Sequence, residues 1–240
     1  AVGMNSLEAN TSGEKNTAIG TRAMSISLIG SSNTAVGNDS LRVNTTGANN
    51  TAVGSEALDA NTTAGSNVAI GKNALGSNTT GDVNTAVGTS SLLLNTTASS
   101  NTAVGGGSMF YNTTGSQNTA VGRDSLYSNT TGIYNVALGY QALYLNTEGN
   151  NNIAVGWRSL DSNTTANDNI AIGKSALQAN TTGTQNVAVG SLALDANTTS
   201  GKNTAIGHGS LGSNTGEQNT AVGRFAMGNN SSASNNVAVG

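Results

Sequence analysis

The feature that most constrains this chain is an internal repeat of 17 residues. The motif Asn-x-Ala-(Val/Ile/Leu)-Gly begins at Asn16, Asn33, Asn50, Asn67, Asn84, Asn101, Asn118, Asn135, Asn152, Asn169, Asn186 and Asn203. It begins again at Asn219, one residue early, and at Asn236. Repeats of this size are units that bury their apolar side chains only by stacking on their neighbours. The sequence therefore predicts a stacked repeat fold.

The short step falls in an Asn-Thr-Thr-(Gly/Ala) segment that closes most repeats. The early repeat reads Asn214-Thr215-Gly216 where its neighbours read Asn-Thr-Thr-Gly. A strand that lost one residue would lose its pairing register, so a segment that tolerates the loss is a turn. Gly or Asn-Thr also interrupts every apolar run before a helix could form. We therefore expect an all-β solenoid or β-roll of about 14 rungs, each with two short strands and two turns.

The two expected strands supply the expected core. One strand is Asn-Thr-Ala-Val, and the other carries a small residue and then a large apolar one, three and four positions after the motif glycine. The large residues are Leu7, Met24, Leu41, Leu58, Leu75, Leu92, Met109, Leu126, Leu143, Leu160, Leu177, Leu194, Leu211 and Met227. The branched residue before each glycine is expected to join them inside the coil.

An unbroken column of alanine lies between these positions on the first strand. Successive strand residues point to opposite faces, so if the branched residue faces the core the alanine faces away from it. A flat apolar stripe along a soluble rod is typical of an interface. We therefore expect a homo-oligomer, with a trimer favoured; a monomeric solenoid whose bend is filled by alanine is the alternative. The expected interface is Ala18, Ala35, Ala52, Ala69, Ala86, Ala103, Ala120, Ala137, Ala154, Ala171, Ala188, Ala205, Ala221 and Ala238.

Composition excludes several classes of partner and site. The net charge of −3 gives no electrostatic reason to expect nucleic acid or an anionic membrane surface as partner. The absence of cysteine excludes disulfides and thiolate metal sites. No apolar run approaches the roughly 20 residues that span a bilayer, and we expect no signal peptide in this segment. Because both ends lie inside the repeat, we expect residues 1–240 to be a single continuous array excerpted from a longer fibre.

Catalytic and metal-binding patterns are missing from the sequence. His208 is the only histidine, and Asp59, Asp161 and Asp195 share a column without occupying adjacent rungs. No acidic or histidine cluster has metal-ligand spacing, and no glycine loop opens a helix as a phosphate site requires. The motif asparagines are expected to hydrogen-bond from rung to rung as a structural ladder. We expect neither enzymatic activity nor a cofactor.

The Asn-x-(Ser/Thr) sequences of the closing turn are candidate N-glycosylation acceptors. They are Asn10, Asn44, Asn61, Asn78, Asn95, Asn112, Asn129, Asn163, Asn180, Asn197 and Asn230. The alternative is a turn that favours Asn and Thr for their local hydrogen bonds. At Asn146 and Asn214 the Asn-Thr pair stays although the acceptor sequence is lost, which favours the structural interpretation. Sugars only ~4.8 Å apart on successive rungs would also be crowded.

Large side chains gather in two short columns. The candidate stripe for a ligand or partner is Leu93, Phe110, Tyr127 and Tyr144 in one column and Tyr140 and Trp157 in another. Aromatic stripes on a rod can stack on sugar rings or become buried against a partner. A ladder of like side chains that merely stabilises the stack is the alternative.

The run Asn-Thr-Ala-Val-Gly-x-x-(Ser/Ala)-Leu resembles the head repeats of the trimeric autotransporter adhesins, the YadA-like family. In those repeats Val-Ala-Ile-Gly is followed by a small residue three positions on. The run is also similar to repetitive regions of some bacteriophage tail fibres, and the resemblance covers residues 16–240. The chain departs from the family in its strict spacing of 17 residues and in its Asn-Thr-Thr turn. The resemblance implies a trimeric, parallel β-roll that makes adhesive or receptor contact at a surface.

Three functional hypotheses follow from these patterns. The first is a rigid structural or adhesive fibre, extracellular on a cell surface or virion, with a surface glycan or receptor as partner. The second is a self-assembling extracellular filament, sugar-coated on its turns, whose repeats stack end to end. The third is an ice-binding solenoid, which is disfavoured because no Thr-x-Thr column recurs on a strand.

Overall fold

The computed structural model describes residues 1–229 and 231–240. Its strands are β1 (Thr17–Ile19), β2 (Thr34–Val36), β3 (Thr51–Val53), β4 (Val68–Ile70), β5 (Thr85–Val87), β6 (Thr102–Val104), β7 (Thr119–Val121), β8 (Val136–Leu138), β9 (Ile153–Val155), β10 (Ile170–Ile172), β11 (Val187–Val189), β12 (Thr204–Ile206), β13 (Thr220–Val222) and β14 (Val237–Val239). Within these described ranges no residue is helical. Each rung thus contributes one strand of three residues.

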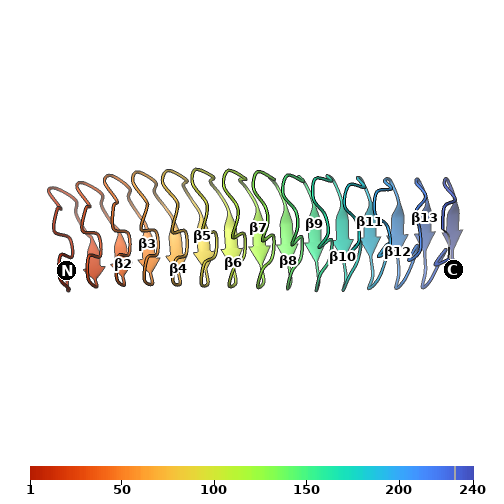
Figure 1. The fold of residues 1–240 in the computed structure, drawn as a ribbon, viewed down its shortest axis with the longest axis horizontal. Helices are drawn as coiled ribbons and strands as arrows, with labels where there is room; N and C mark the ends of the chain where they lie inside the picture. The colour runs from red at the N-terminus through yellow and green to blue at the C-terminus, as the bar shows by residue number, and fades with distance from the viewer. Residues whose placement is uncertain (230) are drawn as a thin grey trace. The chain divides into compact units, whose positions relative to one another are not determined.

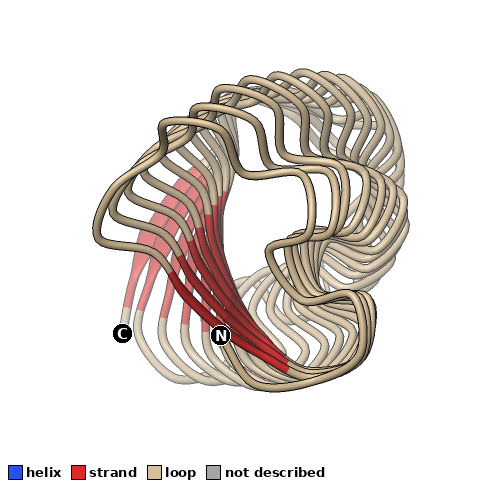
Figure 2. Ribbon diagram, turned by 90° about the vertical axis from the view of Figure 1, so that its left-hand side faces the viewer, coloured by secondary structure: helices blue, strands red, loops and turns tan. Residues whose placement is uncertain are grey.

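The chain divides into two compact units, Ala1–Asn118 with β1 to β6 and Thr119–Gly240 with β7 to β14. Within each unit, consecutive strands pair in parallel and in chain order, as Figure 1 shows. Viewed along the coil, the strands line one side and loops and turns complete each rung (Figure 2). The prediction of a β-solenoid built from 17-residue repeats is confirmed.

Register follows directly from the repeat, because alanine pairs with alanine across neighbouring strands. Ala52 pairs with Ala69 in the first unit, for example. The backbone nitrogen of Thr51 donates to the carbonyl of Asn67 at 2.8 Å, and the nitrogen of Gly54 donates to the carbonyl of Val36 at 2.8 Å. Each strand is therefore hydrogen-bonded to the rung on either side of it, which compensates for its shortness.

The segment expected to form the second strand of each rung consists of turns. In the third full repeat Glu56 and Leu58 have left-handed φ values of 58° and 51°, and the same two positions are left-handed throughout the array. A left-handed conformation costs an ordinary residue about 1–2 kcal/mol. Rung-to-rung bonds offset that cost, since the nitrogen of Leu58 donates to the carbonyl of Ala74 at 3.0 Å. The turns are therefore part of the stack rather than loops attached to it.

The interior of the coil holds the large apolar column and the strand alanines. From Met24 to Leu211 the side chains of that column are fully buried, as predicted. The alanines are also fully buried, which makes the prediction that they face outward wrong. The buried alanines are Ala18, Ala35, Ala52, Ala69, Ala86, Ala103, Ala120, Ala137, Ala154, Ala171, Ala188, Ala205 and Ala221, and Ala238 is half-buried.

The inward orientation of the strand alanines has a steric cause. The narrow coil already contains the large apolar column and two columns of buried asparagine, so only a methyl group fits beneath the strand. The residues on either side of each alanine point outward instead and are half-buried or exposed. The alanine column therefore cannot be an oligomer interface of the folded chain, and the branched residues take its place on the outer face.

Candidate functional site

The motif asparagines form the predicted ladder. The backbone nitrogen of Asn50 donates to Oδ1 of Asn33 at 2.9 Å, and the Nδ2 of Asn50 donates to the carbonyl of Ala64 at 2.8 Å. The same arrangement recurs along both units, and these side chains are buried from Asn33 to Asn219. Their amide groups are therefore used by the fold itself.

The turn asparagines form a second buried ladder. Nδ2 of Asn61 donates to the carbonyl of Ala64 at 3.0 Å and to Oδ1 of Asn44 at 2.8 Å. Nine of the candidate glycosylation acceptors are fully buried: Asn44, Asn61, Asn78, Asn95, Asn112, Asn129, Asn163, Asn180 and Asn197. In the folded chain their Nδ2 atoms are inaccessible to a modifying enzyme, which favours the turn interpretation.

Two acceptors differ from these nine. Asn10 is half-buried, and its Nδ2 donates to the carbonyl of Gly13 at 3.0 Å. Asn230 lies outside the described residues.

The turn ladder is interrupted where the sequence departs from the repeat. Ser27 occupies an asparagine position, and both its Oγ and the Oδ1 of Asn10 are buried without a hydrogen-bond partner. At the one-residue deletion, the Oδ1 of Asn197 is likewise buried without a partner. Burying each of these oxygens without a partner lowers the stability of the fold, and the hydrogen bonds of a regular turn would remove that cost.

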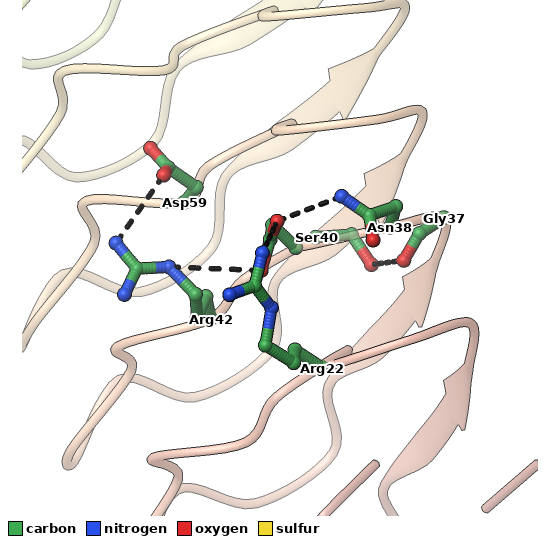
Figure 3. Close-up of polar contacts among 7 residues, drawn as sticks. Arg22, Gly37, Asn38, Ser40, Arg42 and Asp59 are labelled. Atoms are coloured by element: carbon green, nitrogen blue, oxygen red, sulfur yellow. Dashed lines mark hydrogen bonds and ion pairs between the residues drawn. The ribbon is translucent and has the colours of Figure 1, made fainter. Parts of the chain in front are cut away.

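The densest group of charges is a chain of ion pairs on the first unit (Figure 3). Arg22 contacts Asp39 at 2.6 Å, and Arg42 lies 3.9 Å from Asp39 and 3.6 Å from Asp59. Burial raises the pKa of Asp59, while the Arg42 guanidinium opposes that increase. Because each charge faces an opposite one on its own or the next rung, the cluster has a structural explanation.

The outward face of the strands is uncharged in both units. Its residues are Thr17, Ile19, Thr34, Val36, Thr51, Val53, Val68, Ile70, Thr85, Val87, Thr102 and Val104 in the first unit. In the second unit they are Thr119, Val121, Val136, Leu138, Ile153, Val155, Ile170, Ile172, Val187, Val189, Thr204, Ile206, Thr220, Val222, Val237 and Val239. All but one are β-branched, and several are well exposed, among them Ile19, Ile70 and Ile206 at 40–45%. We call this surface the outer strand face.

The candidate aromatic stripe is distributed over both units. Leu93 and Phe110 are half-buried in the first unit, where the Phe110 ring meets Tyr111 edge-on at 4.8 Å. In the second unit Tyr127 and Tyr144 are half-buried and stack with ring centroids 5.2 Å apart. The Phe110–Tyr111 and Tyr127–Tyr144 ring pairs are contacts within the chain, which favours the interpretation of these residues as a ladder that stabilises the stack.

The other column of the stripe is more open. Tyr140 and Trp157 in the second unit are 39% and 44% exposed. Arg158 and Lys174 lie over the Trp157 ring, 5.4 and 5.5 Å from its centroid. Cations over an aromatic face interact favourably with it, so the tryptophan has partners of its own. Its exposed face is nevertheless accessible to a ligand.

A hollow in the second unit was not predicted from the sequence. It has a volume of about 730 Å³ and is lined by Leu192, Asp195, Ala196, Gly209, Gly212, Ser213, Phe225, Met227, Gly228 and Asn229. Its signal in the sequence is the replacement of outward side chains by glycine on adjacent rungs, at Gly209, Gly212 and Gly228. Desolvation by burial raises the pKa of Asp195, which lines the hollow, and backbone hydrogen bonds at Asp195 and Ala196 and the charge interaction with His208 oppose that increase. His208 lies beside this hollow, where its ring meets Phe225 edge-on.

The described part of the chain contains no group of three or more acidic or histidine side chains that could hold a metal ion. Within the same residues, no helix has the length and apolar character needed to cross a membrane. Comparison with protein-family models, curated proteins and solved structures finds no match to this chain.

Proposed function

We propose that this chain is a segment of a structural or adhesive fibre, whose copies associate side by side through the outer strand face. The observation that carries the proposal is that this face is half-buried to exposed in the single chain, bears no charge and consists of Thr and branched aliphatic residues. Contiguous apolar surface of this kind marks interaction sites on soluble proteins. The resemblance to YadA-like head repeats favours three copies.

The geometry of the strands suits a partner with the same repeat. Outward side chains recur at the spacing of paired strands, ~4.8 Å, so a second copy presents ridges at the same pitch. The few hydroxyls on the face belong to threonine, which can pack its methyl group and still satisfy its hydroxyl with water. Identical copies can therefore bury this face without leaving a charged group unpaired.

Solution mass by light scattering on a sizing column tests the association. We expect a discrete mass of three chains. The variant Val155→Lys/Val189→Lys places two charges on the outer strand face and should reduce the mass to that of one chain, because a buried unpaired charge is costly. The matched control is Thr131→Lys/Thr165→Lys, which adds the same charge at exposed turn positions and should leave the mass unchanged.

Other outcomes of the same experiment would favour the other hypotheses. Long filaments of heterogeneous mass would favour an end-to-end filament. A single-chain mass for the unmodified protein would refute association through the outer strand face. Thermal hysteresis of that single chain would then favour ice binding, since the same face carries regularly spaced threonines on β1, β2, β3, β5 and β6.

A further inference from the structure

The hollow in the second unit exists because outward side chains are absent at Gly212 and Gly228, while the Phe225 ring covers the space that Gly209 leaves. The position occupied by Gly212 and Gly228 holds Tyr127, Tyr144, Asp161 and Gln178 on earlier rungs of that unit. Gly209 stands where its neighbours have Leu192 and Phe225. Consecutive omissions on two rungs leave a concave surface bounded by larger side chains, which is the form that small-ligand sites take.

One wall of the hollow is aromatic. Phe225 is 54% exposed, and its ring lies across Gly209, where a Cβ would come within 2.5 Å of the ring atom Cδ1. The ring meets His208 edge-on at 5.1 Å and carries Arg224 4.9 Å from its centroid. His208 and Gly209 pack against the ring and Arg224 lies over it, so the part of the ring that these neighbours leave open is the apolar surface of the hollow.

Other residues that line the hollow supply hydrogen-bond acceptors. Oδ1 of Asp195 lies 3.4 Å from the place where a Cβ on Gly212 would stand, so the carboxylate extends over the space that this glycine leaves open. Leu192, 37% exposed, adds an apolar edge, and Ser213 and Asn229 add groups that both donate and accept. The hollow therefore combines one aromatic face with a few polar groups.

Charge restricts what the hollow can bind. An anionic ligand would meet the Asp195 carboxylate, and a cationic ligand would meet the Arg224 guanidinium over the Phe225 ring. A neutral polyhydroxylated ring avoids both conflicts, since its hydroxyls donate to a carboxylate and its C–H face packs on an aromatic ring. We propose that this hollow binds a neutral sugar residue, with Phe225 against the sugar face and Asp195 accepting its hydroxyls.

The proposal rests on the adhesive function proposed above, because it names the ligand class that such a fibre would contact, but the two can fail separately. Saturation-transfer NMR with the methyl glycosides of glucose, galactose, mannose and N-acetylglucosamine measures binding directly. A single sugar ring offers few contacts, so we expect a dissociation constant of about millimolar order for at least one of them.

Two variants locate the site. Phe225→Ala removes the aromatic wall, and Gly212→Gln fills the hollow with the side chain that this column carries at Gln178. Each should weaken binding by about tenfold or more. The control Trp157→Ala removes another exposed aromatic ring of the same unit and should change binding by less than about twofold. Phe225→Ala should also leave the solution mass unchanged, which separates sugar binding from association.

Three results would overturn the proposal. One is the absence of saturation transfer to all four glycosides at millimolar concentration. Another is binding that Phe225→Ala and Gly212→Gln leave intact while Trp157→Ala abolishes it, which would assign the sugar to the open aromatic column instead. The third is binding of choline, used as a cationic probe, in the same hollow without binding of any glycoside.

Discussion

Glycines occupy two recurrent positions in each rung, and their constraints differ. The glycine that ends each strand has φ between +129° and +140°, and along the array a Cβ there would meet the backbone of the next glycine. The glycine of the closing turn has no positive φ, and Ala64, Ala98 and Ala166 occupy its position in other rungs. A Cβ at most closing-turn glycines would also meet a backbone oxygen of the next rung, so the two positions differ in φ and in the alanines that only the second one accepts.

Gly88 and Gly81, from the same region of the first unit, test that difference. A Cβ on Gly88 would lie 2.7 Å from the backbone carbon of Gly105, so we expect Gly88→Ala to lower the free energy of unfolding by about 3 kcal/mol or more. Gly81→Ala should cost clearly less. Its Cβ would meet the backbone oxygen of Ala98, so the next rung must shift, but φ stays in the ordinary region and three other rungs already have alanine at this position. Denaturant titration measures the free energy of unfolding of both variants. An equal decrease in the two variants would contradict the difference between the two glycine positions.

Ser27 offers a stabilising substitution. In Ser27→Asn, the new amide can donate to the carbonyl of Gly30 and to the unpaired Oδ1 of Asn10, and it can accept from Asn44 on the next rung, as regular turns do. We expect the free energy of unfolding to rise by about 1–2 kcal/mol. Ser12→Asn, at an exposed position, is the control and should be neutral. No gain in the first variant would show that the turn cannot adopt the regular geometry.

Asp195 gives the stability of the second unit a pH dependence. Burial raises its folded pKa above the ordinary 3.8, so its contribution to stability is fully present below that value and is lost as the pH rises through the folded pKa. Asp195→Asn should therefore be more stable than the unmodified chain at neutral pH, with the difference shrinking on acidification. Thermal unfolding across the acid range measures it, with Glu148→Gln at an exposed site as control. A difference independent of pH would exclude this explanation.

Strand and turn differ in how they tolerate a lost residue. A three-residue strand cannot absorb the loss of a residue, because a shift of one position exchanges its inward alanine for an outward branched residue. The closing turn tolerates the loss of a residue. The chain omits one after Thr215, and β13 still pairs with β12 in the regular register. The visible cost of that omission is the unpaired Oδ1 of Asn197.

Two single-residue deletions in the first unit test this contrast. Deleting Thr63 reproduces the short turn and should cost about 1–2 kcal/mol, the cost of one unpaired buried oxygen. Deleting Thr51 shifts β3 and should cost more than about 4 kcal/mol, because alanine leaves the core and the strand loses its bonds. Hydrogen exchange of the amides on β2 and β4 reports the damage. Equal protection in both variants would show that the strands can slip.

At the scale of the whole chain, stability within each unit is the sum of neighbouring contacts. Each strand pairs with the strands directly before and after it in its unit, and the core columns stack in the same order. Such arrays behave as nearly additive chains of repeats. Removing a complete rung should therefore be tolerated far better than removing part of one.

Deleting residues 51–67 tests this additivity, because it joins Asn50 to Val68 and keeps every column continuous. We expect the shortened chain to fold and to lose roughly 1–3 kcal/mol, the share of one repeat. The denaturant m-value should fall in proportion to the residues removed. Loss of the folded state would instead show that this rung has a role that its neighbours cannot replace.

The sequence by itself determined the repeat, its register, the position of the first strand and the identity of the closing turn, because each depends on spacing alone. It also predicted the asparagine ladder and the buried large apolar column, whose residues have the chemistry that a stack requires. The aromatic columns could be found from the sequence too, although their exposure could not.

Only the tertiary structure decided which face of the strand is internal, which conformation the leucine segment adopts and where the surface is hollow. Ala and Val are both apolar, so alternation gave two equivalent orientations, and the limited space of the coil selected the methyl group of alanine. Leucine has no preference for left-handed φ, so the backbone hydrogen bonds of Leu58 to neighbouring rungs hold it in that conformation. The hollow at Gly209 and Gly212 likewise depends on which positions of adjacent rungs become neighbours in space.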